Sequence, residues 1–227
     1  MNDHPRYRNP PLVVEVAGEF ACFTRPEAKA ERVSYEVMTP SAARGVLHAI
    51  FWKPEFEYVI TKIEVLKPIS WFSIRRNEVK TMLSQDWVRR AAADTTVRYD
   101  VETDRDQRNA VCLREVSYRI YAQVQLQAHA TTSESGYREQ FRRRVNKGAC
   151  FSQPFLGTRE FSASFGNPTA AKPIALSKQL GIMLHDIHYD ESGESYSWFS
   201  AALDHGVLQV PRYGLQLPSS RSAAGRG

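Results

Sequence analysis

The chain of 227 residues carries 30 Lys and Arg against 25 Asp and Glu, a formal net charge of +5 with a pI near 9.1. Apolar residues make up 42% of the chain and aromatic residues 11%, which excludes a disordered protein and suffices for one large domain or two small ones sharing a core. The positive charge favours a phosphate backbone or another anionic surface as partner.

The three cysteines, Cys22, Cys112 and Cys150, are odd in number and far apart. No CxxC pair or Cys/His cluster of zinc-like spacing occurs, so we predict free, mostly buried thiols, with no bound metal and no cofactor. The N-terminal region lacks the apolar segment of a signal peptide, and no run approaches the ~18 apolar residues of a spanning helix. We therefore expect a soluble, cytoplasmic protein without a membrane partner.

The first elements of the chain have clear local signatures. Residues 12–24 are rich in β-branched and aromatic side chains and predict a strand, with Gly18 as a bulge or bend. Residues 39–52 predict a helix, because Thr39 can cap it, Pro40 fits its first turn and an apolar stripe follows.

The middle of the chain alternates between extended and helical patterns. Residues 56–74 predict a long strand or a bent pair, interrupted at Pro68. Residues 75–110 are polar and weakly periodic, and we expect a long loop or an inserted hairpin there. Residues 111–130 partly alternate and predict another strand. A second helix follows over residues 135–148.

The C-terminal third reads mainly as extended chain. We expect extended structure over 150–165 and the strands of a small sheet at 180–190 and 206–211. The order strand, helix, strand, strand, helix, strand is that of a ferredoxin-like or RRM-type fold, so we predict an α+β protein. Residues 214–227 have the composition of a disordered tail.

Three segments carry a family resemblance. They are "ACFTRPEAKAERVSYEVMTPSAARGVLHAIFWKP" (21–54), "KPISWFSIRRNEV" (67–79) and "FRRRVNKGACFSQPFLGTREF" (141–161). Together they closely resemble the type I-C CRISPR-associated protein of the fifth Cas family, subtype d, in the RAMP superfamily. The resemblance extends over nearly the whole chain.

This resemblance implies both an architecture and an activity. It implies a ferredoxin-like RAMP domain over 12–155, with an insertion around 75–110, and a C-terminal antiparallel sheet extension over 156–213. It also implies an endoribonuclease that cuts CRISPR repeat RNA at the base of its stem-loop. The protein would then remain on the 5′ handle of the crRNA beside the other subunits of the type I-C Cascade complex.

Cleavage of this kind uses the 2′-OH of the RNA and yields a 2′,3′-cyclic phosphate, so the site must move protons and neutralise charge. In the family, a Tyr in an "IYWKP" turn and a Lys-His pair opening the second helix carry the activity. The corresponding positions here are Phe51, Tyr137 and Arg138. Either Tyr137 supplies the missing phenol and Arg138 stabilises the phosphorane, or Tyr137 belongs to an apolar helix stripe with Phe141 and Val145.

The histidines offer substitutes for the altered positions. His48 lies one turn before Trp52 and close to Phe51, so we include it as a catalytic candidate. For His185 and His188, in the predicted strand 180–190, packing within a sheet is the favoured interpretation.

Basic side chains in the matching segments are candidates for phosphate contacts, which tolerate imprecise geometry. The candidate RNA-binding residues are Arg25, Arg44, Lys53, Arg75, Arg76, Arg142, Arg143, Arg144, Lys147 and Arg159. For the aromatic residues Trp71, Phe151 and Phe155, core packing is favoured over base stacking. We expect Gly157 to permit a tight turn or a close backbone approach rather than to cradle a phosphate.

Two other functions stay open. The altered triad is compatible with a non-catalytic subunit that binds the crRNA handle, and a cysteine hydrolase using Cys150 is a remote alternative without a partner residue suggested by spacing. The positive charge is compatible with binding of double-stranded DNA in each case.

Overall fold

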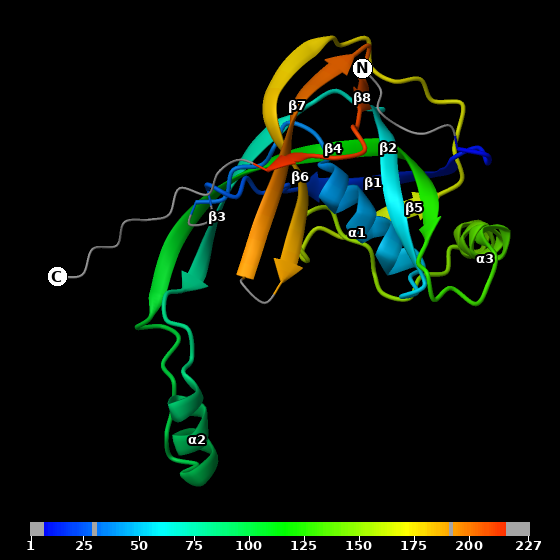
Figure 1. The fold of residues 1–227 in the computed structure, drawn as a ribbon. Helices are drawn as coiled ribbons and strands as arrows, with labels where there is room; N and C mark the ends of the chain where they lie inside the picture. The colour runs from blue at the N-terminus through cyan, green and yellow to red at the C-terminus, as the bar shows by residue number, and fades with distance from the viewer. Residues whose placement is uncertain (1–6, 29–30, 191–192, 217–227) are drawn as a thin grey trace.

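The computed structural model describes residues 7–28, 31–190 and 193–216. It is an α+β structure in which a curled antiparallel sheet carries few helices (Figure 1). In chain order the elements are β1 (Leu12–Ala21), α1 (Pro40–Ile50), β2 (Phe56–Val65), β3 (Trp71–Val79), α2 (Gln85–Ala93), β4 (Arg105–Leu126), α3 (Glu134–Lys147), β5 (Ser164–Gly166), β6 (Lys178–Asp190), β7 (Gly193–Asp204), β8 (Val207–Gln209) and β9 (Leu215–Gln216).

The sheet has the strand order β5-β1-β4-β2-β8-β7-β6, with β3 paired to β4 and β9 to β7. Its neighbouring strands run antiparallel. Helices α1 and α3 lie against the same face, because the Tyr58 ring of β2 contacts both His48 of α1 and Phe141 of α3. One hydrophobic core cluster runs from β1 through both helices to β7.

The two long helices begin and end where the sequence predicts. The Thr39 side chain accepts from the backbone N–H of Ala42 at 3.2 Å at the start of α1. Helix α3 is capped by Ser133 and ends at Gly148, whose left-handed φ of 62° suits glycine. The buried face of α3 includes Tyr137, Phe141 and Val145, which agrees with the apolar stripe, one of the two alternatives for Tyr137.

Residues 75–110 lie mostly in an arm that projects from the body of the molecule (Figure 1). Strands β3 and β4 pair from Trp71↔Leu113 to Val79↔Arg105, and α2 sits at the tip with no buried residue. Strand β4 continues into the body, where it pairs with β1 and β2. Between the stretches of β4 that pair with β3 and with β2, Glu115 adopts a left-handed φ of 53°.

Two parts of the C-terminal third differ from the sequence-based expectation. Strand β7 was not predicted, although its Tyr196, Trp198 and Phe199 are residues that favour strands. Of the segment 150–165, which was expected to be extended, only the last two residues belong to a strand, β5. Within the rest of the segment, an isolated bridge joins Phe155 to Ser162. The predicted tail begins with β9, and its residues 217–227 lie outside the described part.

A charged network is buried at the centre of the sheet. The Arg119 guanidinium on β4 donates to Glu15 of β1 at 2.9 Å and to Glu64 of β2 at 2.8 Å. It also donates to the carbonyl oxygens of Thr169 and Ala171 at 2.9 and 2.8 Å. One side chain therefore ties three strands to the segment that follows β5.

The cysteines are free thiols, as predicted, with Cys22 and Cys112 buried and Cys150 half-buried. Among the described residues, no helix is both long enough and apolar enough to cross a membrane.

Candidate functional site

The structure brings together Phe51 at the end of α1 and Tyr137 near the start of α3. Both rings contact Phe56, with centroid separations of 5.6 Å for Phe51 and 4.9 Å for Tyr137. All three side chains are buried. The positions expected from sequence to carry catalysis thus meet in space, but they meet as part of the core.

Tyr137 is 2% exposed, and its hydroxyl has no partner in hydrogen-bonding geometry. The nearby Glu55 carboxylate accepts from the Thr131 hydroxyl at 2.6 Å. The hydrogen bond from Thr131, together with the nearby Tyr137 hydroxyl, lowers the pKa of Glu55. The Tyr137 phenol therefore faces a carboxylate rather than open solvent.

Arg138 is also 2% exposed and is engaged on every side. Its guanidinium donates to Gln123 at 3.2 Å, to Glu134 at 3.1 Å and to the carbonyl oxygen of Pro10. Burial lowers its pKa. In this conformation Arg138 fastens the N-terminal segment to α3, and contact with a phosphate would require breaking these bonds.

His48 is half-buried on α1, between Tyr58 and Trp52, with ring centroids 5.7 and 6.3 Å away. Its Nε2 atom is buried without a hydrogen-bond partner. Burial, assisted by the charge of Arg44 and opposed by that of Asp186, lowers the pKa of His48 to about 4. The imidazole is therefore neutral in the folded protein at neutral pH.

This environment predicts an acid-sensitive contribution to stability. The unfolded chain takes up a proton at His48 near its ordinary pKa of 6.5, whereas the folded protein does so only near 4. Stability should consequently fall as the pH falls between these values, and His48→Gln should reduce that loss. Urea unfolding at pH 7 and pH 4.5 measures it, with His205→Gln on the surface as control; an unchanged loss in His48→Gln would contradict this account.

The candidate basic residues divide into two groups. Four are engaged within the protein: Arg25 with Glu27 and the Tyr35 ring, Arg44 with Asp186, Arg76 with Glu160, and Arg144 with the carbonyl oxygen of Ile50 and the Phe51 ring. The other six are exposed at the surface: Lys53, Arg75, Arg142, Arg143, Lys147 and Arg159. Of these, Arg142 pairs with Glu139 and Arg75 donates to Asn109.

Exposed aromatic rings accompany the basic side chains where α1 ends. Trp52 is 52% exposed and Phe151 is 83% exposed. The backbone N–H of Phe151 donates to the carbonyl oxygen of Ala49 at 2.8 Å, which places the loop after α3 against the end of α1. We call Trp52, Lys53, Arg143, Lys147 and Phe151 the α1–α3 surface.

The expectation that the three aromatic candidates pack in the core was wrong for all of them. Phe151, Trp71 and Phe155 all belong to the exposed large apolar residues of the chain. An aromatic side chain in a matching segment carries no local signal that separates a core position from a stacking position. Their exposure makes each ring available for base stacking.

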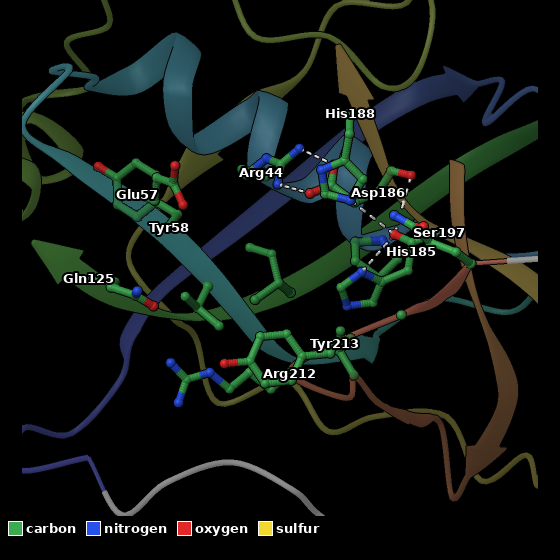
Figure 2. A pocket seen from close by; sticks show the side chains of 16 residues that line it. Arg44, Glu57, Tyr58, Gln125, His185, Asp186, His188, Ser197, Arg212 and Tyr213 are labelled. Atoms are coloured by element: carbon green, nitrogen blue, oxygen red, sulfur yellow. Dashed lines mark hydrogen bonds and ion pairs between the residues drawn. The ribbon is translucent and has the colours of Figure 1, made fainter. Parts of the chain in front are cut away.

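A cavity of about 380 Å³ opens beside the other end of α1 (Figure 2). Its wall includes the Arg44–Asp186 ion pair, His185, His188 and Ser197, while Arg212 and Tyr213 lie on another side of it. Sequence reasoning placed the two histidines in sheet packing and missed this cavity, because it is assembled from segments that are distant along the chain.

The polar groups of this cavity converge on one hydroxyl. Ser197 Oγ lies 3.5 Å from His185 Nδ1 and 3.4 Å from His188 Nε2. His185 Nε2 lies 2.9 Å from the carbonyl oxygen of Pro211. Burial lowers the pKa of His185, and the bonds and charge from Arg44 outweigh burial to lower the pKa of Asp186.

The family of this chain follows from comparison with known proteins. The family model Cas_Cas5d, described as CRISPR-associated protein (Cas_Cas5), matches residues 11–202, which is most of the chain. The chain belongs to the Cas5d family. The resemblance noted in the sequence is therefore confirmed.

Curated relatives of this Cas5d-family chain cover most of its length. A protein of Mannheimia succiniciproducens is 45% identical over 216 residues, covering 88% of this chain and 94% of its own. One of Thermus thermophilus is 45% identical over 219 residues, covering 88% of this chain and 91% of its own. Each is named "CRISPR pre-crRNA endoribonuclease Cas5d".

Solved structures share the fold at low identity. The "Crystal Structure of CRISPR-associated Protein" matches with a TM-score of 0.64 at 21% identity, covering 94% of this chain and 96% of that chain. A chain of a "CRISPR RNA-guided surveillance complex" matches with a TM-score of 0.51 at 12% identity, covering 88% and 91%. These similarities support the α+β architecture of the Cas5d family.

Proposed function

We propose that this protein cuts CRISPR repeat RNA at the base of its stem-loop without a metal ion and then stays on the 5′ handle of the crRNA in the type I-C Cascade complex. The carrying observation is its 45% identity, over 88% of its length, to two proteins named CRISPR pre-crRNA endoribonucleases. Its similarity to a chain of a CRISPR RNA-guided surveillance complex supports the second half of the proposal.

The N-terminal part of the chain is, on this proposal, a ferredoxin-like domain. The strand order β5-β1-β4-β2, with α1 and α3 on one face, supports it, since it corresponds to order 4-1-3-2 of a βαββαβ unit. The pairing of β5 with β1 favours an end of this domain at residue 166 rather than 155. Strands β6 to β9 then form the C-terminal extension, and the arm of residues 75–110 is the insertion.

The α1–α3 surface is the part of the protein we assign to RNA. Exposed cations attract phosphates, and exposed rings such as Trp52 and Phe151 stack on unpaired bases. Arg75, Arg142 and Arg159 are exposed basic residues outside this surface that extend the contact. The same cations support binding of double-stranded DNA, which the proposal includes as a sequence-independent activity.

A second candidate function is supported by the residues at the family's catalytic positions. Phe51 has no group that exchanges a proton, and Arg138 remains charged and is occupied by Glu134 and Gln123. These observations favour a non-catalytic subunit that binds the crRNA handle and relies on another nuclease for processing.

One experiment separates the two candidates. The purified chain is incubated with the CRISPR repeat hairpin RNA encoded beside its own gene, in EDTA, and the products are resolved at single-nucleotide resolution. Cleavage at one site with a 2′,3′-cyclic phosphate end is expected for the enzyme. Binding of an RNA that stays intact would establish the scaffold and contradict the enzyme.

The RNA interface is tested by removing its charge. Replacing Lys53, Arg143 and Lys147 with alanine should weaken binding of the hairpin about 10- to 100-fold near 0.1 M salt and should flatten the salt dependence, because fewer counterions are released. Alanine at Arg89, Arg90 and Arg98 of the arm removes the same charge and is the control. If both variants lose the same affinity for the hairpin, the effect comes from net charge alone and the α1–α3 surface is not the RNA interface.

A further inference from the structure

None of the residues at the family's catalytic positions is placed to act as a general base on bound RNA. Phe51, Tyr137 and Arg138 are each at most 3% exposed. A general base must come within hydrogen-bonding distance of the proton that it removes. An enzyme with this structure therefore needs a proton acceptor elsewhere that RNA can reach.

The cavity beside α1 holds two imidazoles in a fixed relation. Because a carbonyl oxygen only accepts, the 2.9 Å contact with Pro211 places the proton of neutral His185 on Nε2. His185 Nδ1 then has a free lone pair toward Ser197 Oγ, 3.5 Å away. The Ser197 hydroxyl donates in that direction and shares its proton with the carbonyl oxygen of Asp186, also 3.5 Å away.

This arrangement determines the orientation of His188. With its proton turned toward His185, Ser197 Oγ presents lone pairs to His188 Nε2 at 3.4 Å. His188 Nε2 therefore donates, and its Nδ1 atom is left with the lone pair of a base. His188 is exposed, whereas Ser197 is buried, so the outer imidazole is the one that a substrate can reach.

The rest of the cavity suits one nucleotide of an RNA strand. Its volume of about 380 Å³ lies in the usual range of small-ligand pockets, about 300–1,000 Å³. Arg212 lies against the exposed Tyr213 ring, 5.1 Å from its centroid, and can hold a phosphate. Glu57 and Gln125 on another side of the cavity offer acceptors and donors for the edge of a base (Figure 2).

The position of the cavity also agrees with the proposed RNA interface. Arg44 lines the cavity and Trp52 belongs to the α1–α3 surface, eight residues later in the chain. Six of these steps lie within α1, about 9 Å at about 1.5 Å per residue, and Phe51 and Trp52 follow the end of the helix. An RNA strand bound at the α1–α3 surface thus needs to extend by only a few nucleotides to enter the cavity.

We propose that His188 is the general base for RNA cleavage in this protein, held in place by Ser197 and His185. The inference rests on the proposed endoribonuclease function. The 2′-OH gives its proton to His188 Nδ1 while O2′ bonds to phosphorus and the bond from phosphorus to O5′ breaks. The leaving O5′ takes a proton from solvent, and the imidazolium later returns its proton to solvent, which leaves a cyclic phosphate and a 5′-OH.

The test is single-turnover cleavage of the repeat hairpin by His188→Gln. Glutamine can still donate to Ser197 but cannot act as a base at neutral pH. Loss of a general base costs about 10²- to 10⁴-fold in rate, so we expect at least a 100-fold slower cut with a Kd for the hairpin within threefold of that of the unaltered protein. His205→Gln, at an exposed histidine of the β7–β8 turn, should cut at the normal rate.

The outcomes distinguish the role of His188 from the proposed endoribonuclease function. If the unaltered protein leaves the hairpin intact, both proposals are wrong. If the unaltered protein and His188→Gln cut equally fast, the inference alone is wrong. If His188→Gln still cuts the hairpin and Tyr137→Phe does not, the catalytic group is Tyr137, near the start of α3, and not His188.

Discussion

Gly157→Ala is expected to leave little folded protein. Gly157 has a φ of +88°, and an added Cβ would lie 1.9 Å from the carbonyl oxygen and 2.5 Å from the carbonyl carbon of Cys22. Both atoms are backbone, and the N–H of Cys22 donates to Leu156 at 3.0 Å, so neither chain can shift without breaking that contact. We expect a loss of more than about 4 kcal/mol in the free energy of unfolding, measured by urea denaturation.

The matched control is Gly181→Ala. Gly181 has a similar φ of +79°, but nothing lies within 4 Å of its added Cβ. This variant carries only the left-handed backbone strain, about 1–2 kcal/mol. Equal losses in the two variants would show that the close approach to Cys22 does not matter, and that the backbone conformation alone requires glycine.

Arg119→Met should have the next largest effect on stability. The variant leaves the Glu15 and Glu64 carboxylates at the centre of the sheet without the cation that lies between them. Removing one partner of a buried ionic network typically costs about 3–5 kcal/mol. Urea unfolding at pH 7 measures the loss, and retention of full stability would contradict a structural role for the network.

A triple variant distinguishes loss of the network from loss of packing. When Glu15→Gln and Glu64→Gln are added to Arg119→Met, no carboxylate of the network is left without its cation, although Lys62 loses its partner Glu64, so part of the stability should return. Burial opposes ionisation of both carboxyls, but hydrogen bonds from Thr169 and Arg119 lower the pKa of Glu15, and Lys62, Tyr121 and Arg119 lower the pKa of Glu64. The ionised carboxylates stabilise the folded protein above their unfolded pKa, and this stabilisation is lost as the pH falls. The difference in free energy of unfolding between Arg119→Met and the unaltered protein should therefore shrink below about pH 4.5.

Local signals predicted the parts of the fold that depend on them. Thr39 and Gly148 set the ends of the two long helices, because capping is decided by a few neighbouring residues. Strand β7 was missed because its pairing with β6 is a property of the tertiary structure. The helical tip of the arm was also missed; α2 has no buried residue, and its Trp87 ring contacts Tyr99 within the arm.

The site was predicted less well than the fold. From the sequence, both Arg138 and Arg142 were expected to contact RNA, whereas the first is buried against Glu134 and the second is exposed. Whether an arginine faces water depends on which segment covers it, and here the cover is the N-terminal chain at Pro10. The cavity of His188 was beyond local reasoning, because α1, β2, β6 and β7 must meet before it exists.

The single strand β4 has a mechanical consequence for the arm. Its outer half pairs with β3 over nine residues, about 30 Å at the usual rise of a strand, and its inner half is the centre of the sheet. The strand is continuous from the arm into the body, and one left-handed residue, Glu115, lies between its two halves. We therefore expect the arm to act as a spacer that holds whatever contacts α2 away from the body of the molecule.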